Sequence, residues 1–170
     1  QEKVAVFQSL FQGRDDVFAK RWYSPSSQKA GYQPVCEREW NRKYCDKRKY
    51  KCGDCPNRLF AHLSYNDFFN HLAGKDPFGR DVIGLYPLCK DNTCYFLCTD
   101  FDDKNSEHGY KNDVLAFVNV CKSWNVPYYI ERSRSGKGAH VWIFFDKPIM
   151  ALMARRLGNA ILTEAMNRDA

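Results

Sequence analysis

The chain has 170 residues, of which 44% are hydrophobic, and it carries a formal net charge of +6. This length and hydrophobic content suffice for one sizeable core with a small additional module. No apolar run is long enough to span a bilayer and no signal peptide opens the chain, which argues against membrane and secreted classes, so we expect a cytoplasmic protein without a membrane partner.

The positive charge is concentrated in the first third of the chain. Residues 1–60 hold 13 Lys and Arg against 7 Asp and Glu, whereas residues 61–170 hold 13 of each. The densest basic segment contains Lys47, Arg48, Lys49 and Lys51, and aromatic residues are interspersed around it. This mixture suits a nucleic acid, because phosphates attract cations and bases stack on aromatic rings. An ordinary solvated face would have the same composition.

Four of the eight cysteines lie close together in this basic region. Cys52 and Cys55 have the two-residue spacing that lets neighbouring thiolates hold one tetrahedral ion. We therefore predict a structural zinc site with the ligands Cys36, Cys45, Cys52 and Cys55, since four thiolates leave no open position for catalysis. Such an ion would help to fold a loop that has few apolar residues. The alternative is a set of exposed free thiols.

Periodicity and turn signals predict the secondary structure. In chain order the predicted elements are a helix over 4–11, loops around 24–31, the cysteine loop, a short helix between Ser64 and Gly74, a turn over 76–79, strands over 82–88 and 93–102, a helix over 114–124, strands over 127–133 and 139–145, and a helix over 149–166.

From residue 93 onward the order is strand, helix, strand, strand, helix, which is one strand short of a βαββαβ sheet. We therefore expect an α/β (α+β) fold in which an RNA-recognition-like mixed sheet with flanking helices occupies residues 63–170. Residues 1–62 would form a small basic module with the zinc-binding loop at 36–55. Because the chain begins with Gln and ends before the last strand, we expect a fragment that lacks a C-terminal strand.

Asp100 and Asp102 end the apolar strand over 93–102. Alternate residues of a strand point to the same face, so the two carboxylates repel each other unless a cation lies between them. Mg²⁺ favours such oxygen ligands, and ligand sites often form at the ends of central strands. The alternative is an ordinary solvated strand end.

A glycine-rich turn between two later strands offers groups that suit a triphosphate. These groups are Arg132, Ser135, Gly136, Lys137, Gly138 and His140. The alternative is a plain hairpin turn in which the glycines supply positive φ angles, Lys137 is solvated and His140 is a core residue. An acidic strand end for metals next to a basic turn for phosphates is a layout for two-metal nucleotidyl transfer.

At these residues the chain resembles the archaeo-eukaryotic primase superfamily. A hydrophobic strand ending in Asp-x-Asp matches Asp100 and Asp102, and a Ser-to-His hairpin matches Ser135 and His140. In particular, the chain resembles the primase domain of TOTE conflict systems, bacterial cassettes that pair such a domain with helicases. The matching segments are 14–19, 31–36, 52–58 and 131–145.

The resemblance implies a DNA primase-polymerase, a nucleotidyltransferase that uses nucleoside triphosphates on a single-stranded DNA template or a primer-template, with a helicase as partner or fused domain. Asp100 and Asp102 would bind Mg²⁺ or Mn²⁺, while Ser135 and His140 would contact the triphosphate, with Lys137 and Arg132 as neighbouring contacts. The family's third acidic residue has no candidate after His140. The resemblance therefore does not imply that this fragment is active alone.

A rival interpretation is a non-catalytic, zinc-containing module that binds single-stranded nucleic acid. It predicts exposed aromatic residues on the sheet face and no metal at Asp100. A metal-dependent nuclease would need further acids or a base near the aspartate pair, and the sequence offers none.

Overall fold

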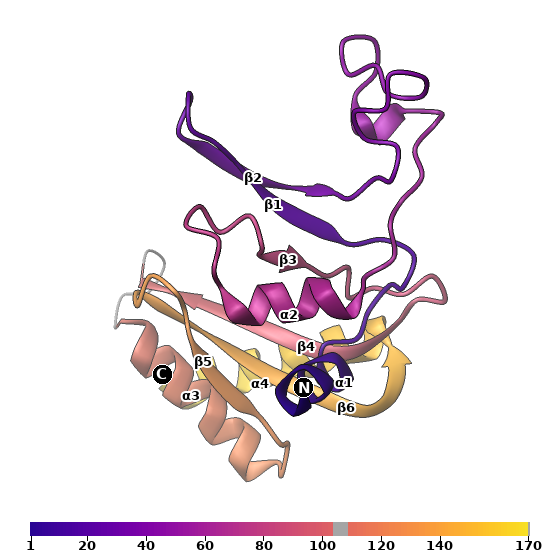
Figure 1. The fold of residues 1–170 in the computed structure, drawn as a ribbon. Helices are drawn as coiled ribbons and strands as arrows, with labels where there is room; N and C mark the ends of the chain where they lie inside the picture. The colour runs from indigo at the N-terminus through magenta and orange to yellow at the C-terminus, as the bar shows by residue number, and fades with distance from the viewer. Residues whose placement is uncertain (104–108, 170) are drawn as a thin grey trace. The chain divides into compact units, whose positions relative to one another are not determined.

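The chain folds into two compact units, residues 1–86 and 87–170. The computed structural model describes residues 1–103 and 109–169, apart from the side chain of Asp169 (Figure 1). The sequence suggested a boundary between residues 62 and 63, whereas the structure divides the chain between residues 86 and 87. The intervening segment, 63–86, contributes a helix and a short strand to the first unit.

The first unit combines two helices with an antiparallel sheet of strand order β2-β1-β3. In chain order its elements are α1 (Glu2–Leu10), β1 (Ala19–Ser24), β2 (Lys29–Pro34), the 3₁₀ turn η1 (Cys52–Asp54), α2 (Tyr65–Ala73) and β3 (Ile83–Gly84). Val4, Phe18, Phe68 and Ile83 form its buried core. One apolar residue from each helix contributes to this core, and partly buried apolar side chains pack against it: Phe7, Val35, Ala61 and Leu63.

Helix α2 begins and ends where the sequence predicts. The Ser64 side chain accepts a hydrogen bond from the Asp67 backbone N–H, while the Asp67 carboxylate accepts one from the Ser64 N–H. This reciprocal capping box satisfies donors that the first helical turn leaves open. Gly74, with φ of 57°, ends the helix in the left-handed conformation that favours glycine.

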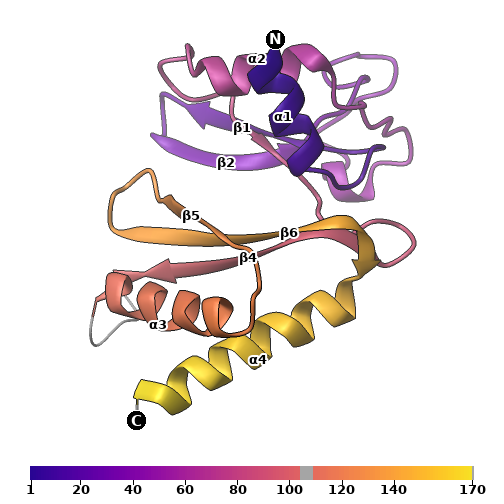
Figure 2. The same cartoon turned by 90° about the horizontal axis from the view of Figure 1, so that it is seen from below.

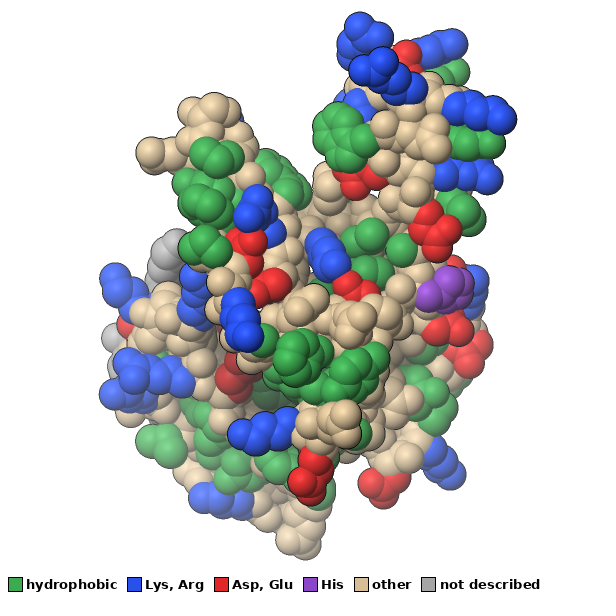
Figure 3. All heavy atoms as spheres, viewed as in Figure 1, with side chains coloured by type: hydrophobic (Ala, Val, Ile, Leu, Met, Phe, Trp, Pro, Cys, Tyr) green, Lys and Arg blue, Asp and Glu red, His purple; other side chains and the backbone are tan. Residues whose placement is uncertain are grey.

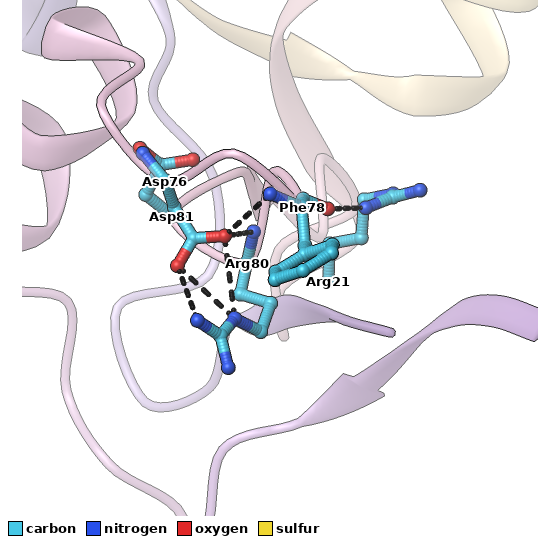
Figure 4. A network of polar contacts seen from close by, with 5 residues as sticks. All are labelled: Arg21, Asp76, Phe78, Arg80 and Asp81. Atoms are coloured by element: carbon cyan, nitrogen blue, oxygen red, sulfur yellow. Dashed lines mark hydrogen bonds and ion pairs between the residues drawn. The ribbon is translucent and has the colours of Figure 1, made fainter. Parts of the chain in front are cut away.

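The predicted turn after α2 is held by a network of polar contacts (Figure 4). The Asp76 carboxylate accepts hydrogen bonds from the Phe78 backbone N–H at 2.9 Å and from the Arg80 guanidinium at 2.8 Å. Hydrogen bonding from Arg80 lowers the pKa of Asp76 to about 2. Arg21 of β1 donates to the Phe78 carbonyl group and so ties this turn to the sheet.

Strands β1 and β2 form a hairpin that the sequence did not predict. Their residues are mostly charged, aromatic or small, so they lack the apolar alternation of a half-buried strand. The Trp22 indole lies across Gly31, where an added Cβ atom would be 3.0 Å from the ring. A cross-strand contact of this kind involves residues on two strands and leaves no periodic signal in either one.

The second unit is a three-stranded sheet with the order β4-β6-β5 and two helices. Its elements are β4 (Thr93–Asp102), α3 (Tyr110–Ser123), β5 (Tyr129–Arg132), β6 (Gly138–Met150) and α4 (Ala151–Asp169). The predicted strand, helix, strand, strand, helix order is therefore confirmed. The expected mixed sheet is not seen, because the strands pair only antiparallel in both sheets of the described residues. Among helices within residues 1–103 and 109–169, none is long and apolar enough to cross a bilayer.

Helices α3 and α4 cover one face of this sheet (Figure 2). Val141 and Ile143 of β6 are buried with Phe117 of α3 and Ile161 of α4. Each of these side chains contributes about 1.5–3 kcal/mol by leaving water. A slip of one residue would turn β6 over and expose this set, so the core fixes which residues face away from the helices. Those residues of β6 include His140.

Candidate functional site

The antiparallel pairing of β4 and β6 brings the acidic strand end to His140. Asp100 lies opposite His140 in the register, and Asp102 lies opposite Gly138. Residues directly opposite each other share a face, so both aspartates and the imidazole lie on the face that α3 and α4 do not cover. The distance from His140 Nε2 to Asp100 Oδ1 is 3.5 Å. The structure thus brings together the three residues on which the proposed chemistry depends most.

Gly138 permits a close approach beside Asp102. A Cβ atom at position 138 would lie 2.5 Å from the Phe101 carbonyl oxygen and 3.0 Å from Asp102 Oδ1. The sequence suggested that Gly136 and Gly138 could both supply positive φ angles, but among the described residues only Gly136 of these two does, with φ of 72°. Glycine is therefore required at position 138 for space and at position 136 for conformation.

The turn between β5 and β6 exposes Ser135 and Lys137. Ser135 Oγ accepts a hydrogen bond from the Lys137 backbone N–H at 3.2 Å, which fixes the local shape of the turn. The Lys137 carbonyl group accepts a hydrogen bond from the Asp103 N–H, also at 3.2 Å. The base of the turn therefore lies against the end of β4, next to Asp102.

Arg132 lies on the other face of the sheet. It is paired with Ala139, which is buried in the helix-covered core. Its Nη2 atom is 3.5 Å from the carbonyl oxygen of Gly136. The structure does not bring Arg132 to Asp100 and His140, because alternate residues of β5 point to opposite faces. Arg132 was predicted to contact the triphosphate because of its closeness in sequence, but it lies on the other face of the sheet.

Glu131 joins the site, although the sequence did not single it out. It lies opposite His140 in the pairing of β5 with β6, and its Oε2 atom is 3.2 Å from His140 Nδ1. The same oxygen accepts a hydrogen bond from Trp142 Nε1 at 2.9 Å. A hairpin closed by the turn 133–137 pairs residue 131 with residue 140, so the length of the turn was the signal that could have identified this residue.

Aromatic rings continue along the same sheet face from His140. Ring centroids are 5.8 Å apart for His140 and Trp142, and 6.3 Å apart for Trp142 and the parallel ring of Phe144. Phe96 of β4 is 5.7 Å from Trp142. Although Cys98 is exposed by surface area, desolvation and then the charges of Asp100 and Glu131 raise the pKa of its thiol to about 12. That thiol is therefore neutral and a poor metal ligand or nucleophile.

The carboxylates of Asp100 and Asp102 have few partners among the described residues. In the described part of the chain, Asp100 lies next to the His140 imidazole, which forms an ion pair with it only when the ring is protonated, and Asp102 has no ionic partner. Across residues 1–103 and 109–169, no three His, Cys, Asp or Glu side chains are placed to hold a metal ion between them. Asp100 and Asp102 nevertheless fit Mg²⁺ or Mn²⁺, since Mg²⁺ is commonly bound by one or two carboxylates together with substrate phosphates and water.

The four clustered cysteines line one hollow in the first unit, together with residues such as Tyr44 and Phe60. Its space for water-sized groups is about 30 Å³. The Leu59 N–H donates to Cys36 Sγ at 3.4 Å. Because the described His, Cys, Asp and Glu side chains form no metal-binding group of three, the predicted zinc-binding module is not shown. The thiols surround a common space without standing at ligand positions.

The predicted basic residues are exposed on the loop between β2 and α2. Figure 3 shows Lys and Arg side chains gathered over this loop. Lys47 Nζ lies 3.9 Å from the ring centroid of Trp40, and Lys49 Nζ lies 5.3 Å from that of Tyr50. Cations and aromatic faces are therefore adjacent, as the mixed composition of the segment suggested.

Comparison with known protein families matches residues 2–170 to the family described as TOTE conflict system, Archaeo-Eukaryotic Primase domain. Comparison with curated proteins finds no match to the chain. The family match extends over both units, including the basic loop as well as the strand pair that carries Asp100 and His140. The chain therefore belongs to the archaeo-eukaryotic primase family of TOTE conflict systems.

Proposed function

We propose that the chain is the catalytic domain of a DNA primase-polymerase, which adds nucleotides from nucleoside triphosphates to a template-bound hydroxyl group of a primer or an initiating nucleotide. A primase-family domain implies a nucleotidyltransferase with nucleotide and nucleic-acid substrates, and that much follows from family membership. The observation that best supports the finer proposal is the β4–β6 register, in which Asp100 faces His140 and Asp102 faces Gly138.

In this proposal Asp100 and Asp102 supply carboxylate oxygens for Mg²⁺ or Mn²⁺. When bound there, such ions would lower the pKa of the attacking hydroxyl and neutralise the charge of the departing pyrophosphate. The hydroxyl oxygen would lose its proton to water and form a bond to the α-phosphorus, while the bond from that phosphorus to the bridging oxygen breaks and pyrophosphate leaves. The aspartates orient the reacting groups from one side of the site, which converts a slow bimolecular step into a positioned one.

The triphosphate would be held by the turn and by His140. Ser135 and Lys137 are exposed on the turn, whose base lies against the end of β4 beside Asp102. Lys137 offers a mobile cation, and His140 Nε2 offers a directional group on the same sheet face as Asp100. Gly136 and Gly138 keep this region compact. Arg132 is not assigned to the triphosphate, because it lies on the opposite face of the sheet.

We also propose that the basic loop grips single-stranded template and that a zinc ion organises it. Lys47, Arg48, Lys49 and Lys51 would contact phosphates, and adjacent rings would stack on bases.

The four thiols that share one hollow need only converge to reach tetrahedral zinc distances. Purified protein should contain about one zinc per chain, and its Co²⁺ form should show thiolate charge-transfer absorption. A metal-free protein with four titratable thiols and unchanged DNA binding would refute the zinc proposal. A cytoplasmic location and a helicase partner complete the proposal.

The direct test is the Asp100→Ala/Asp102→Ala double variant in a protein that incorporates nucleotides. Incorporation should be abolished, while binding to single-stranded DNA stays within about threefold of wild type, because the basic loop is untouched. Asp146→Ala, at an exposed position later on β6, is the matched control and should remain active. Wild-type incorporation by the double variant would refute the assignment of the aspartates.

A second candidate, a non-catalytic nucleic-acid-binding module, is favoured by the aromatic rings on the sheet face. Tyr129 on β5 is 62% exposed and lies 5.8 Å from Phe144, at the end of the ring series. A nucleoside triphosphate with Mn²⁺ should raise the melting temperature of a nucleotidyltransferase, since a ligand of the folded state stabilises it. A pure binding module should respond to oligonucleotide and not to the triphosphate.

A further inference from the structure

We propose that Glu131 is a positioning residue that fixes the orientation and tautomer of His140. By accepting a hydrogen bond from Nδ1–H, it would direct the His140 Nε2 atom toward Asp100 and the reacting phosphates. The orientation is a property of the hairpin itself, and its role in the reaction rests on the proposed function.

The geometry places one carboxylate oxygen between two aromatic donors. Glu131 Oε2 is 3.2 Å from His140 Nδ1 and 2.9 Å from Trp142 Nε1. An indole N–H can only donate, and an ionised carboxylate can only accept. The bond from Trp142 therefore holds the Glu131 oxygen as an acceptor at the place where it meets the imidazole. The imidazole meets that oxygen through Nδ1–H, so the ring is held with its Nε2 edge toward Asp100.

The strand pairing makes this arrangement rigid. Glu131 lies opposite His140, and Tyr129 lies opposite Trp142, so the carboxylate is on the same face as both rings. His140 and Trp142 pack edge to face, with ring planes at 64° to each other. The imidazole is therefore limited by Trp142 along its own strand, by Glu131 on β5 and by Asp100 on β4.

Glu131 is at the wrong nitrogen to be the missing third metal ligand. It contacts Nδ1, whereas Asp100 approaches Nε2, so the two carboxylates meet opposite ends of the ring. One of its oxygens already accepts from both His140 and Trp142. Among the groups that the structure describes, Glu131 joins no cluster of three that could hold a metal. A carboxylate near a polyphosphate would by itself repel it. Any contribution of Glu131 to the reaction must therefore come through His140.

The experiment compares Glu131→Ala with the conservative Glu131→Gln in the whole chain, with melting temperature as the folding control. The Gln carbonyl oxygen can still accept from Nδ1–H. Glu131→Ala should therefore lower kcat by about 10–100-fold, the range typical when a residue that orients a ligating or catalytic histidine is lost. Glu131→Gln should stay within about threefold of wild type, and neither variant should change the Mn²⁺ concentration for half-maximal activity.

Two further measurements separate positioning from other roles. In a His140→Ala background, Glu131→Ala should cost nothing more, because the residue acts through the ring. Nitrogen-15 spectra of the histidine side chains should show His140 protonated at Nδ1 in wild type and a changed Nδ1 signal in Glu131→Ala.

The outcomes distinguish this inference from the proposed function. The expected spectra in a protein that never incorporates nucleotides would uphold the positioning of His140 and refute the enzymatic proposal. Protonation at Nε2 in wild type would overturn the inference, as would additive losses in the double variant. A raised Mn²⁺ concentration for half-maximal activity in Glu131→Ala would instead make Glu131 a metal ligand and would equally overturn the inference.

Discussion

Replacing Gly138 by alanine should separate β4 from β6 at the position of Asp102. The added Cβ atom would lie 2.5 Å from the Phe101 carbonyl oxygen, which belongs to the backbone and has no rotamer with which to withdraw. Relief therefore requires the two strands to move apart. Overpacking of this kind costs about 1–3 kcal/mol. For a chain of this length that corresponds to a fall in melting temperature of roughly 3–10 °C.

The same variant should also weaken the response to Mn²⁺ and nucleoside triphosphate, because the Cβ atom would lie 3.0 Å from Asp102 Oδ1. Circular dichroism during heating, with and without these ligands, measures both effects. Gly53→Ala is the matched control, since its added Cβ atom meets nothing within 4 Å. A Gly138→Ala protein that melts within about 1 °C of wild type and responds normally to ligand would show that the strands do not approach as described.

Two other substitutions test the core and the turn after α2. Phe117→Ala, at a fully buried position of α3, should destabilise the protein by about 3–5 kcal/mol in urea unfolding, whereas Leu115→Ala on the exposed side of the same helix should cost less than about 1 kcal/mol; equal costs would contradict the assigned faces. For Asp76, the pKa is lowered to about 2 by Arg80, so its stabilising effect is present above the unfolded value near 3.8 and is lost as the pH falls through about 2. Asp76→Asn should therefore lower the melting temperature at pH 7 and lessen its decline between pH 4 and pH 2, and an unchanged pH profile would refute the ion pair.

The second unit could be predicted well because its elements have strong local signals. The helix that contains Val114, Phe117 and Val118 buries one face, and β6 alternates buried Val141 and Ile143 with residues of the other face. Both patterns are periodic in the sequence. The first unit lacks them. The β1–β2 hairpin depends on cross-strand contacts such as Trp22 on Gly31, and no rule of spacing along one strand reveals such a contact.

The candidate site was predictable to the extent that it follows from strand alternation. Asp100 and Asp102 are two residues apart, so their common face could be inferred without coordinates. Assigning the partners across the strands required the register, which depends on the length of the turn over 133–137. That is why Arg132, chosen for its closeness in sequence, lies on the far face, and why Glu131 was missed. The four cysteines show a further limit, since their spacing predicts a zinc site but does not determine how closely the thiols converge.

The acidic face should carry a small electrostatic cost in the absence of metal, which gives a test independent of catalysis. Asp100 and Asp102 are both exposed and lie two residues apart on β4. At a separation of about 7 Å in water, two unit charges repel by about 0.6 kcal/mol. Replacing both aspartates by asparagine should therefore leave the metal-free protein as stable as wild type or slightly more stable, even though His140 loses its partner Asp100. The wild type alone should then gain stability from added Mn²⁺, by an amount that grows with the logarithm of its concentration above the dissociation constant. If the asparagine variant were clearly less stable without metal, the aspartates would be structural residues, and the argument for a cation at this face would fail.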